Sequence, residues 1–167
     1  MKEKQKLINL YTDGACRTNG SWAGGAGLYV ELEKSKEYFY YCALETTNNI
    51  MELKAFHFAL HYSYFYGDLD TEVNVYTDSA YVVNCLKNGW FVKWETNGWL
   101  NSKKEPVANR ELWEEILGLY KKMSFHKLNI HKVKAHSGNP GNVLADKLAV
   151  KGRDEATNCL WRRTDEF

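Results

Sequence analysis

The sequence predicts an α/β fold in which two strands deliver acidic side chains to the same edge of a sheet. Residues 6–14 (KLINLYTDG) form a short apolar run that ends at Asp13, and residues 73–79 (VNVYTDS) form a second run that ends at Asp78 in the same Tyr-Thr-Asp triplet. Residues 50–66, which lie between them, carry apolar side chains at helical spacing. If the two strands are parallel neighbours, their aspartates meet at the carboxyl edge, where α/β sheets bind ligands.

Two buried carboxylates placed close together repel each other unless a cation lies between them. The repeated triplet therefore predicts a metal-holding acidic site built from Asp13 and Asp78. The alternative is that each aspartate only caps the segment that follows it.

The first half of the chain predicts a meander followed by a helix. A loop of small residues at 15–25 leads into strands at 26–32 and 37–44, which a charged turn separates. The helix at 50–66 buries the stripe Ile50, Leu53, Phe56, Leu60 and Tyr64. Glu52 lies beside this stripe, either as the second half of a capping box with Asn49 or as a third carboxylate aimed at the sheet edge.

The second half predicts two helices, a strand and a final helix. A short helix at 79–87 is followed by a segment with Trp90, Trp94 and Trp99, which could stack on a nucleic acid or form the core of a protruding substructure. An amphipathic helix is expected at 109–123 and a strand at 128–134. The last helix is expected at 143–151 with Asn142 as its N-cap, which puts Asp146 on its first turn.

Length and composition predict one soluble domain. The chain has 167 residues, of which 44% are hydrophobic and 26% charged, enough to bury a core. We expect a single domain over 1–167, with the fold over 6–152 and a polar C-terminal tail at 153–167. No window is long enough to span a membrane and the N-terminus lacks the apolar core of a signal peptide, so a cytoplasmic protein is expected. The cysteines are scattered without zinc-site spacing and are expected to be reduced thiols.

Charge is unevenly distributed along the chain. Residues 87–134 contain ten basic and five acidic side chains, although the whole chain carries a net charge of only +1. A basic segment beside an acidic site is typical of proteins that bind a polyanion.

Three segments and the opening Tyr11-Thr-Asp-Gly14 together resemble the ribonuclease H type 1 family, of the bacterial ribonuclease HI kind. The segments are 47–53 (TNNIMEL), 76–81 (YTDSAY) and 136–146 (HSGNPGNVLAD), and the resemblance covers essentially the whole chain. It implies a ribonuclease H-like fold: a five-stranded mixed sheet, made of an antiparallel meander plus two parallel strands, flanked by helices and bearing a Trp-rich protruding insert. It also implies an endonuclease that hydrolyses the RNA strand of RNA/DNA hybrids and leaves 5′-phosphate and 3′-hydroxyl ends.

The resemblance implies a two-metal site with Mg²⁺ as cofactor, for which Mn²⁺ can substitute. Asp13 would bridge both ions, Asp78 and Asp146 would hold the ion on the side of the nucleophile, and Glu52 would hold the other ion and touch a ribose 2′-hydroxyl. Carboxylates without soft ligands suit these hard cations better than zinc. His136 resembles the family's mobile histidine, which assists proton transfer or product release.

The resemblance also implies substrate-binding residues. Asn19 and Asn48 would read the RNA minor groove; Trp90, Trp94 and Ser102 would form a channel for the DNA strand; Thr47 and Asn109 would bind a DNA phosphate. Three features depart from the family: Glu45 replaces an arginine of the phosphate pocket, residues 95–97 (ETN) replace a basic stretch, and Ala80 replaces a longer polar side chain. We therefore expect weaker hybrid binding than in a fully basic relative, but an intact reaction.

Two other functions remain open at this point. A resolvase or integrase would use the same carboxylate chemistry on DNA, and a binding module would have lost the chemistry altogether. The tryptophan segment and the Asn19/Asn48 pair favour a hybrid substrate, and the presence of all four acids argues against a lost activity. No obligate protein partner is expected, and the protein is expected to be a monomer.

Overall fold

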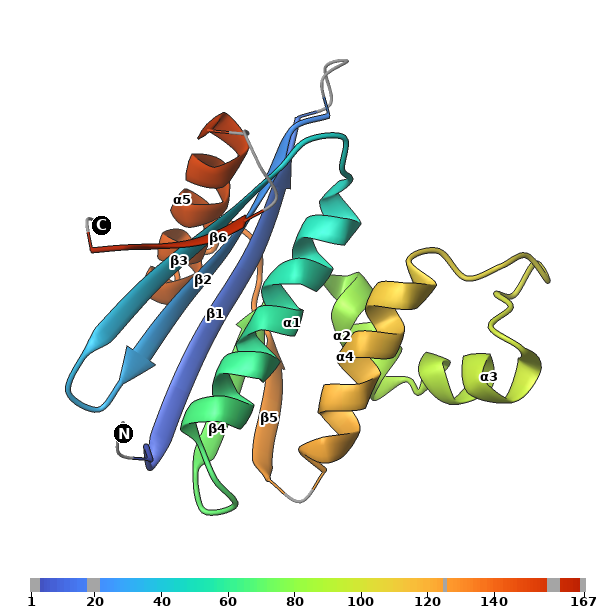
Figure 1. The fold of residues 1–167 in the computed structure, drawn as a ribbon, viewed down its shortest axis with the longest axis horizontal. Coiled ribbons are helices and arrows are strands. Elements are labelled where there is room, and N and C mark those ends of the chain that lie inside the picture. The colour runs from blue at the N-terminus through green and yellow to red at the C-terminus, as the bar shows by residue number, and fades with distance from the viewer. Residues whose placement is uncertain (1–3, 18–21, 125, 156–159, 166–167) are drawn as a thin grey trace.

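A computed structural model describes residues 4–17, 22–124, 126–155 and 160–165, and its centre is a mixed sheet with helices on both sides (Figure 1). The strands follow the order β5-β4-β1-β2-β3-β6 across the sheet. The elements along the chain are β1 (Leu7–Cys16), β2 (Gly24–Leu32), β3 (Lys36–Ala43), α1 (Asn48–Tyr66), β4 (Glu72–Thr77), α2 (Ala80–Lys87), α3 (Trp90–Asn97), α4 (Arg110–Lys122), β5 (Lys127–Lys132), α5 (Pro140–Glu155) and β6 (Leu160–Thr164).

The central strands confirm the predicted topology. β1, β2 and β3 form an antiparallel meander, and β4 joins β1 in parallel with Tyr11 opposite Tyr76 and Thr12 opposite Thr77. β5 extends the sheet in parallel with β4. The register brings the carboxyl ends of β1 and β4 side by side, which is the arrangement that the repeated triplet predicts.

The sheet has a sixth strand, so the prediction of five strands and a polar tail is wrong for residues 160–164. β6 pairs antiparallel with β3, and Trp161 stacks on Phe58 of α1 with ring centroids 4.3 Å apart. The segment LWRRT has one apolar side chain that faces the protein and arginines that reach solvent. Such a short edge strand carries too little hydrophobic alternation to be recognised from its sequence.

α1 and α5 cover opposite faces of the sheet (Figure 1). α1 packs on β1 and β2 and against α4, and its buried side includes Leu53, Phe56 and Leu60, as the sequence predicts. The prediction is wrong for Tyr64, which is 45% exposed at the end of the stripe. α5 packs on β1, β2 and β3. It approaches β2 very closely, because a Cβ added to Gly27 would lie 2.2 Å from the carbonyl oxygen of Ala145.

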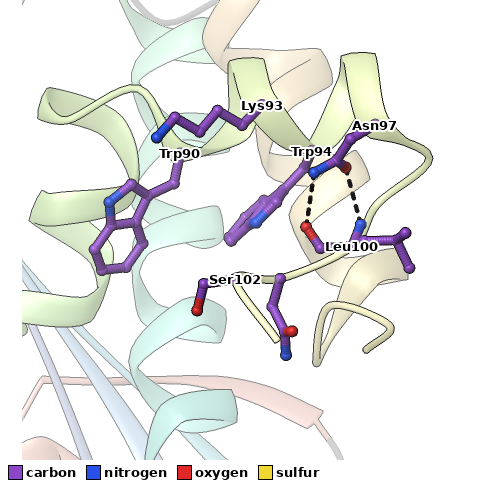
Figure 2. Close-up of a pocket in the computed structure, with 7 residues that line it drawn as sticks. Trp90, Lys93, Trp94, Asn97, Leu100 and Ser102 are labelled. Carbon is purple, nitrogen blue, oxygen red and sulfur yellow. Dashed lines mark hydrogen bonds between the residues drawn. The ribbon is translucent and has the colours of Figure 1, made fainter. Parts of the chain in front are cut away.

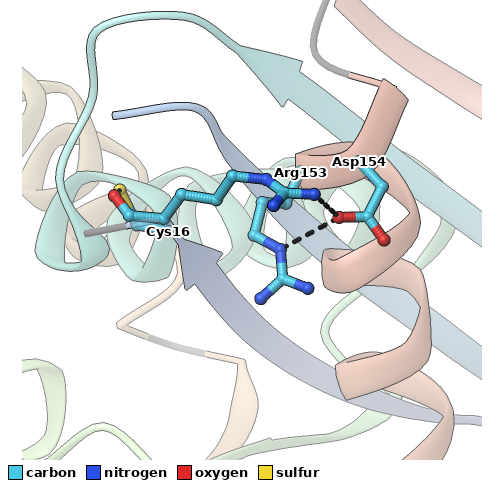
Figure 3. A network of polar contacts seen from close by, with 4 residues as sticks. Cys16, Arg153 and Asp154 are labelled. Carbon is cyan, nitrogen blue, oxygen red and sulfur yellow. Dashed lines mark hydrogen bonds and ion pairs between the residues drawn. The ribbon is translucent and has the colours of Figure 1, made fainter. Parts of the chain in front are cut away.

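An ion-pair network joins the far end of α5 to the end of β1 (Figure 3). Asp154 Oδ1 accepts a hydrogen bond from Arg17 Nη2 at 2.6 Å and a second from Arg153 Nε at 3.2 Å. The Cys16 thiol lies nearby, and burial raises its pKa. These pairs are partly exposed, so they contribute little stability beyond holding the helix end in place.

α3 and the loop after it project from the body of the molecule, as the predicted insert requires (Figure 1). Gly89 before the helix and Gly98 after it both adopt positive φ, at 68° and 80°. Trp94 on α3 packs edge-on against Trp113 of α4, with ring centroids 5.7 Å apart, so the insert shares the main core. None of the helices among the described residues combines the length and hydrophobicity required to span a membrane.

Candidate active site

Carboxylates from β1, α1 and the end of β4 converge at the carboxyl edge of the sheet. Oxygen atoms of Asp13, Glu52 and Asp78 all lie within 4.8 Å of one another. Asp13 and Glu52 are each only 5% exposed. Three acids at such distances, two of them buried, need a neutralising cation or protons.

Gly14 brings α1 against β1 at this point. Its amide donates hydrogen bonds to Asp13 Oδ1 at 2.9 Å and to Glu52 Oε1 at 3.2 Å. A Cβ at position 14 would lie 2.6 Å from the Glu52 amide nitrogen, so only glycine permits this approach. Glu52 Oε2 is buried and has no hydrogen-bond partner, which leaves one carboxylate oxygen of the cluster available as a ligand.

The capping alternatives for these acids are wrong. Thr47 is the N-cap of α1, with its Oγ1 accepting a hydrogen bond from the Ile50 amide. Ser79 caps α2 in the same way. Because other side chains cap both helices, neither Glu52 nor Asp78 serves that purpose.

α5 supplies the fourth acid, and it begins three residues earlier than predicted. The helix starts at Pro140, and Asn139 Oδ1 accepts a hydrogen bond from the Asn142 amide, so Asn139 rather than Asn142 occupies the capping position. Proline is favoured at the first position of a helix because its missing N–H would be unpaired there in any case. Asp146 therefore lies on the second turn of α5 rather than on the first.

All four predicted acids line one cavity of about 420 Å³. His136 lines it from the loop before α5, where its backbone has a positive φ of 55°, and Asn48 lines it from the first turn of α1. The structure thus brings together the five predicted catalytic residues and one predicted substrate residue.

Burial is the main influence on the protonation of the acids. Burial, with a further contribution from the charge of Asp78, raises the pKa of Asp13 from 3.8 to about 8. Burial also raises the pKa of Glu52 well above its usual value, with the charges of Asp13 and Asp78 adding to the effect. The pKa of Asp78 is raised by burial too.

A second cavity, of about 430 Å³, lies on the protruding insert (Figure 2). Trp90, Trp94 and Ser102, the three residues predicted for the DNA channel, all line it, together with Lys93. Trp94 is only 8% exposed and belongs to the main core, which supports the structural interpretation for this residue, whereas its contact with a nucleic acid stays a prediction. Asn97 forms hydrogen bonds with both the amide and the carbonyl of Leu100, and both residues line the cavity.

The remaining predicted substrate residues are less closely grouped. Asn109 lies at the start of α4 with a positive φ of 62° and lines a cavity with Ile50, the residue whose amide Thr47 caps. Glu45 is exposed just before Thr47. Asn19 lies outside the described residues.

Among the unpredicted residues that line these cavities, Tyr81 and Lys93 carry side chains that can contact a ligand. Tyr81 lines the acidic cavity, and its hydroxyl accepts a hydrogen bond from Trp113 Nε1 at 2.7 Å. Lys93 lines the tryptophan cavity. The helical spacing of Trp90 and Trp94 could have identified Lys93, since it lies between them on the same helix.

The sequence matches the family model for RNase H over residues 5–154. The chain belongs to the ribonuclease H family. The predicted family, its α/β fold and its status as a nuclease are therefore confirmed.

Relatives of this family resemble the chain along most of its length. It is 40% identical to a Ribonuclease H of Caldanaerobacter subterraneus subsp. tengcongensis over 154 residues, covering 90% of this chain and 94% of the relative. It is 41% identical to a Ribonuclease H of Desulforamulus reducens over 145 residues, covering 87% of this chain and 86% of the relative.

Solved structures agree with the fold. The crystal structure of LC9-RNase H1, described as a type 1 RNase H with the type 2 active-site motif, has a TM-score of 0.74 and 27% identity, covering 94% of this chain and 76% of that one. The structure of LC11-RNase H1 in complex with an RNA/DNA hybrid has a TM-score of 0.65 and 26% identity, covering 89% of this chain and 98% of that one.

Proposed function

We propose that this chain hydrolyses the RNA strand of RNA/DNA hybrids with divalent cations held by Asp13, Glu52, Asp78 and Asp146, leaving 5′-phosphate and 3′-hydroxyl ends. The observation that carries the proposal is the convergence of three carboxylates within 4.8 Å from separate elements. A fourth acid lines the same cavity. The hybrid bound to a family member of the same fold supports the substrate.

The donor atoms of this cluster fit Mg²⁺, and Mn²⁺ would be held in the same way. They are carboxylate oxygens. Among the described residues, the cluster whose ligand atoms lie within 4.8 Å of one another contains no histidine or cysteine. Oxygen-rich sites suit hard cations, whereas zinc prefers nitrogen and sulfur ligands. Glu52 Oε2, buried without a donor, is the atom with most to gain from a cation.

When bound, two such cations would supply activation of the attacking water and neutralisation of the charge that develops on the leaving 3′ oxygen. The chain's own residues set the geometry for this reaction. The Gly14 amide holds one oxygen each of Asp13 and Glu52 and so fixes the two carboxylates relative to each other. Asp78, directly after β4, and Asp146 of α5 also line the cavity.

His136 would move a proton during the reaction. Its exposed side chain lies at the rim of the cavity, and an imidazole can gain or lose a proton near neutral pH. We assign it to protonate the leaving 3′ oxygen or to aid release of the 5′-phosphate product. Asn48 carries amide groups that can pair with a ribose 2′-hydroxyl, the group that separates RNA from DNA.

Cleavage of a strand-labelled RNA/DNA hybrid tests the proposal. We expect Mg²⁺-dependent cutting of the RNA strand only, with no cutting of duplex DNA or of a branched DNA junction. Asp78→Asn should lower kcat by roughly a hundredfold or more, because it removes one ligand charge. Asp70→Asn, an identical change on an exposed turn, serves as the matched control. Equal rates for Asp78→Asn and wild type would refute the metal mechanism, and cutting of the DNA strand would refute the substrate. Activity as a cytoplasmic monomer stays a prediction.

A further inference from the structure

Aromatic rings form a continuous ladder on one face of the sheet. Tyr38, Tyr29, Tyr11, Tyr76 and His131 stand side by side on β3, β2, β1, β4 and β5, each ring 4.5 to 5.7 Å from the next. The pair in closest contact is Tyr11 with Tyr76, whose centroids are 4.5 Å apart and whose planes differ by 10°. This pair has no role in the reaction proposed above.

The stacked pair lies directly beneath two of the acids. Side chains two residues apart on a strand share a face, so Asp13 projects from β1 on the side of Tyr11. Asp78 follows Tyr76 by the same two residues, directly after the end of β4, and the two tyrosines are register partners. The stack therefore fixes the two strands relative to each other two residues before Asp13 and Asp78.

The same ring also meets the start of α5. A Cβ added to Gly141 would lie 2.3 Å from Tyr11 Cε1 and 2.5 Å from Tyr11 Cζ, far inside van der Waals contact. Gly141 is buried at the second position of the helix. The backbone of α5 at Gly141 therefore packs directly against the Tyr11 ring, five residues before Asp146.

We propose that Tyr11 is a positioning residue for the metal site: its ring, seated between Tyr76 and Gly141, sets the separation between the Asp13/Asp78 pair and Asp146. The inference rests on the metal role proposed for these acids. It involves the ring and not the hydroxyl, because both contacts are made by ring atoms. A cluster of ligands from three elements needs such a common support, since displacement of a ligand by about 1 Å lowers activity strongly.

Substitution at the contact itself tests the proposal. Gly141→Ala places a methyl group against the ring and should displace α5, which weakens Mg²⁺ binding by about tenfold, the scale seen when groups that orient metal ligands are altered. Tyr11→Leu opens the space, so the same Gly141→Ala change made in that background should weaken binding by less than about twofold. Tyr11→Phe keeps the ring and should match wild type.

Mg²⁺ binding is measured by calorimetry without substrate, well below the lowest melting temperature of the set, and hybrid cleavage is followed against Mg²⁺ concentration in parallel. Gly118→Ala, which meets no atom within 4 Å on α4, controls for a glycine replaced in a helix. Tyr38→Leu, at the other end of the ladder, controls for general loss of stacking and should lower the melting temperature without changing Mg²⁺ affinity.

An equal loss of Mg²⁺ affinity from Gly141→Ala in both backgrounds would overturn the inference, and so would unchanged Mg²⁺ affinity in every variant. Loss of affinity in Tyr38→Leu equal to that in Gly141→Ala would also overturn it, because the effect would then be general. If the variants show the expected differences in Mg²⁺ affinity but the wild-type protein leaves the hybrid intact, the positioning role is supported and the proposed hydrolysis is refuted.

Discussion

Glu45 is the residue whose charge opposes the proposed substrate most directly. It is exposed two positions before Thr47 and three before Asn48, and its backbone already has a positive φ of 49°. An acid at this position repels a nearby phosphate, and it also forgoes the counterion release that a basic residue would provide. The backbone strain is the same for arginine as for glutamate, so the side chain can be exchanged without changing the fold.

Glu45→Arg should therefore tighten hybrid binding by about three- to tenfold at low salt, with the gain shrinking as salt is added. Affinity for a hybrid is measured against salt concentration in the absence of Mg²⁺, so that no cleavage occurs. Glu33→Arg makes the same charge change on the exposed turn between β2 and β3, at the opposite end of the strands, and should have little effect. No gain from arginine at position 45 would refute the phosphate pocket.

Most residues of the site could be predicted from the sequence, because an acid that follows an apolar strand-like run is visible in the sequence itself. Asp13 and Asp78 were predictable from a repeated triplet, since parallel pairing brings their ends together. The function of Gly14 was not predictable, because a glycine directly after the apolar run is typical of a turn, whereas β1 continues through it to Cys16. Its amide is shared by Asp13 and Glu52 only once α1 has packed against β1.

Among the elements, α3 is the one whose side chains divide most clearly between structure and proposed binding. Trp94 is buried against Trp113, whereas Trp90 lies half-buried beside Lys93 on the wall of the same cavity. An aromatic ring and a lysine on one wall suit the sugars and phosphates of a nucleic acid strand. Trp90 is therefore the better probe of binding, because its removal leaves the core of the insert in place.

Trp90→Ala should raise KM for a hybrid by roughly tenfold while leaving kcat within about twofold, because the helix lies away from the acids. Steady-state cleavage of a labelled hybrid gives both constants. Val92→Ala, at an exposed position on the same helix, is the matched control. A fall in kcat with KM unchanged would show that the insert affects the chemistry rather than binding.

Element boundaries were predictable only where a local signal exists. α1 ends at Gly67, where the amide bonds to Ser63, as the glycine predicts. The start of α5 was predicted too late, because Asn139-Pro140 is a stronger start signal than Asn142. β6 could not be predicted, since its stability depends on pairing with β3 and on one ring packed against α1.

In the molecule as a whole, folding and metal binding favour different protonation states of the acidic cavity. Folding without metal favours protonated acids, whereas a cation binds the ionised carboxylates. Asp13, Glu52 and Asp78 come from three elements, and folding removes the first two almost completely from water. Their raised pKa values mean that the metal-free folded state keeps protons that the unfolded chain has released. A divalent cation would replace those protons and remove the repulsion.

The metal-free protein should lose stability as pH rises. The pKa of Asp13 is raised by burial and by Asp78 from 3.8 to about 8, so its contribution is full below pH ~4 and is lost as pH rises through about 8. Between pH 6 and pH 8 in a chelator, the melting temperature of wild type should fall by roughly 5 °C relative to Asp13→Asn, which has no proton to lose at position 13. Added Mg²⁺ should reverse the trend for wild type and stabilise it more at pH 8 than at pH 6, because the ion competes with protons for the same oxygens.

Thermal melts of the two proteins, each with chelator and with Mg²⁺, provide the comparison. Parallel pH curves for wild type and Asp13→Asn in chelator would mean that Asp13 does not retain a proton on folding, and an equal Mg²⁺ effect at both pH values would mean that the ion binds elsewhere.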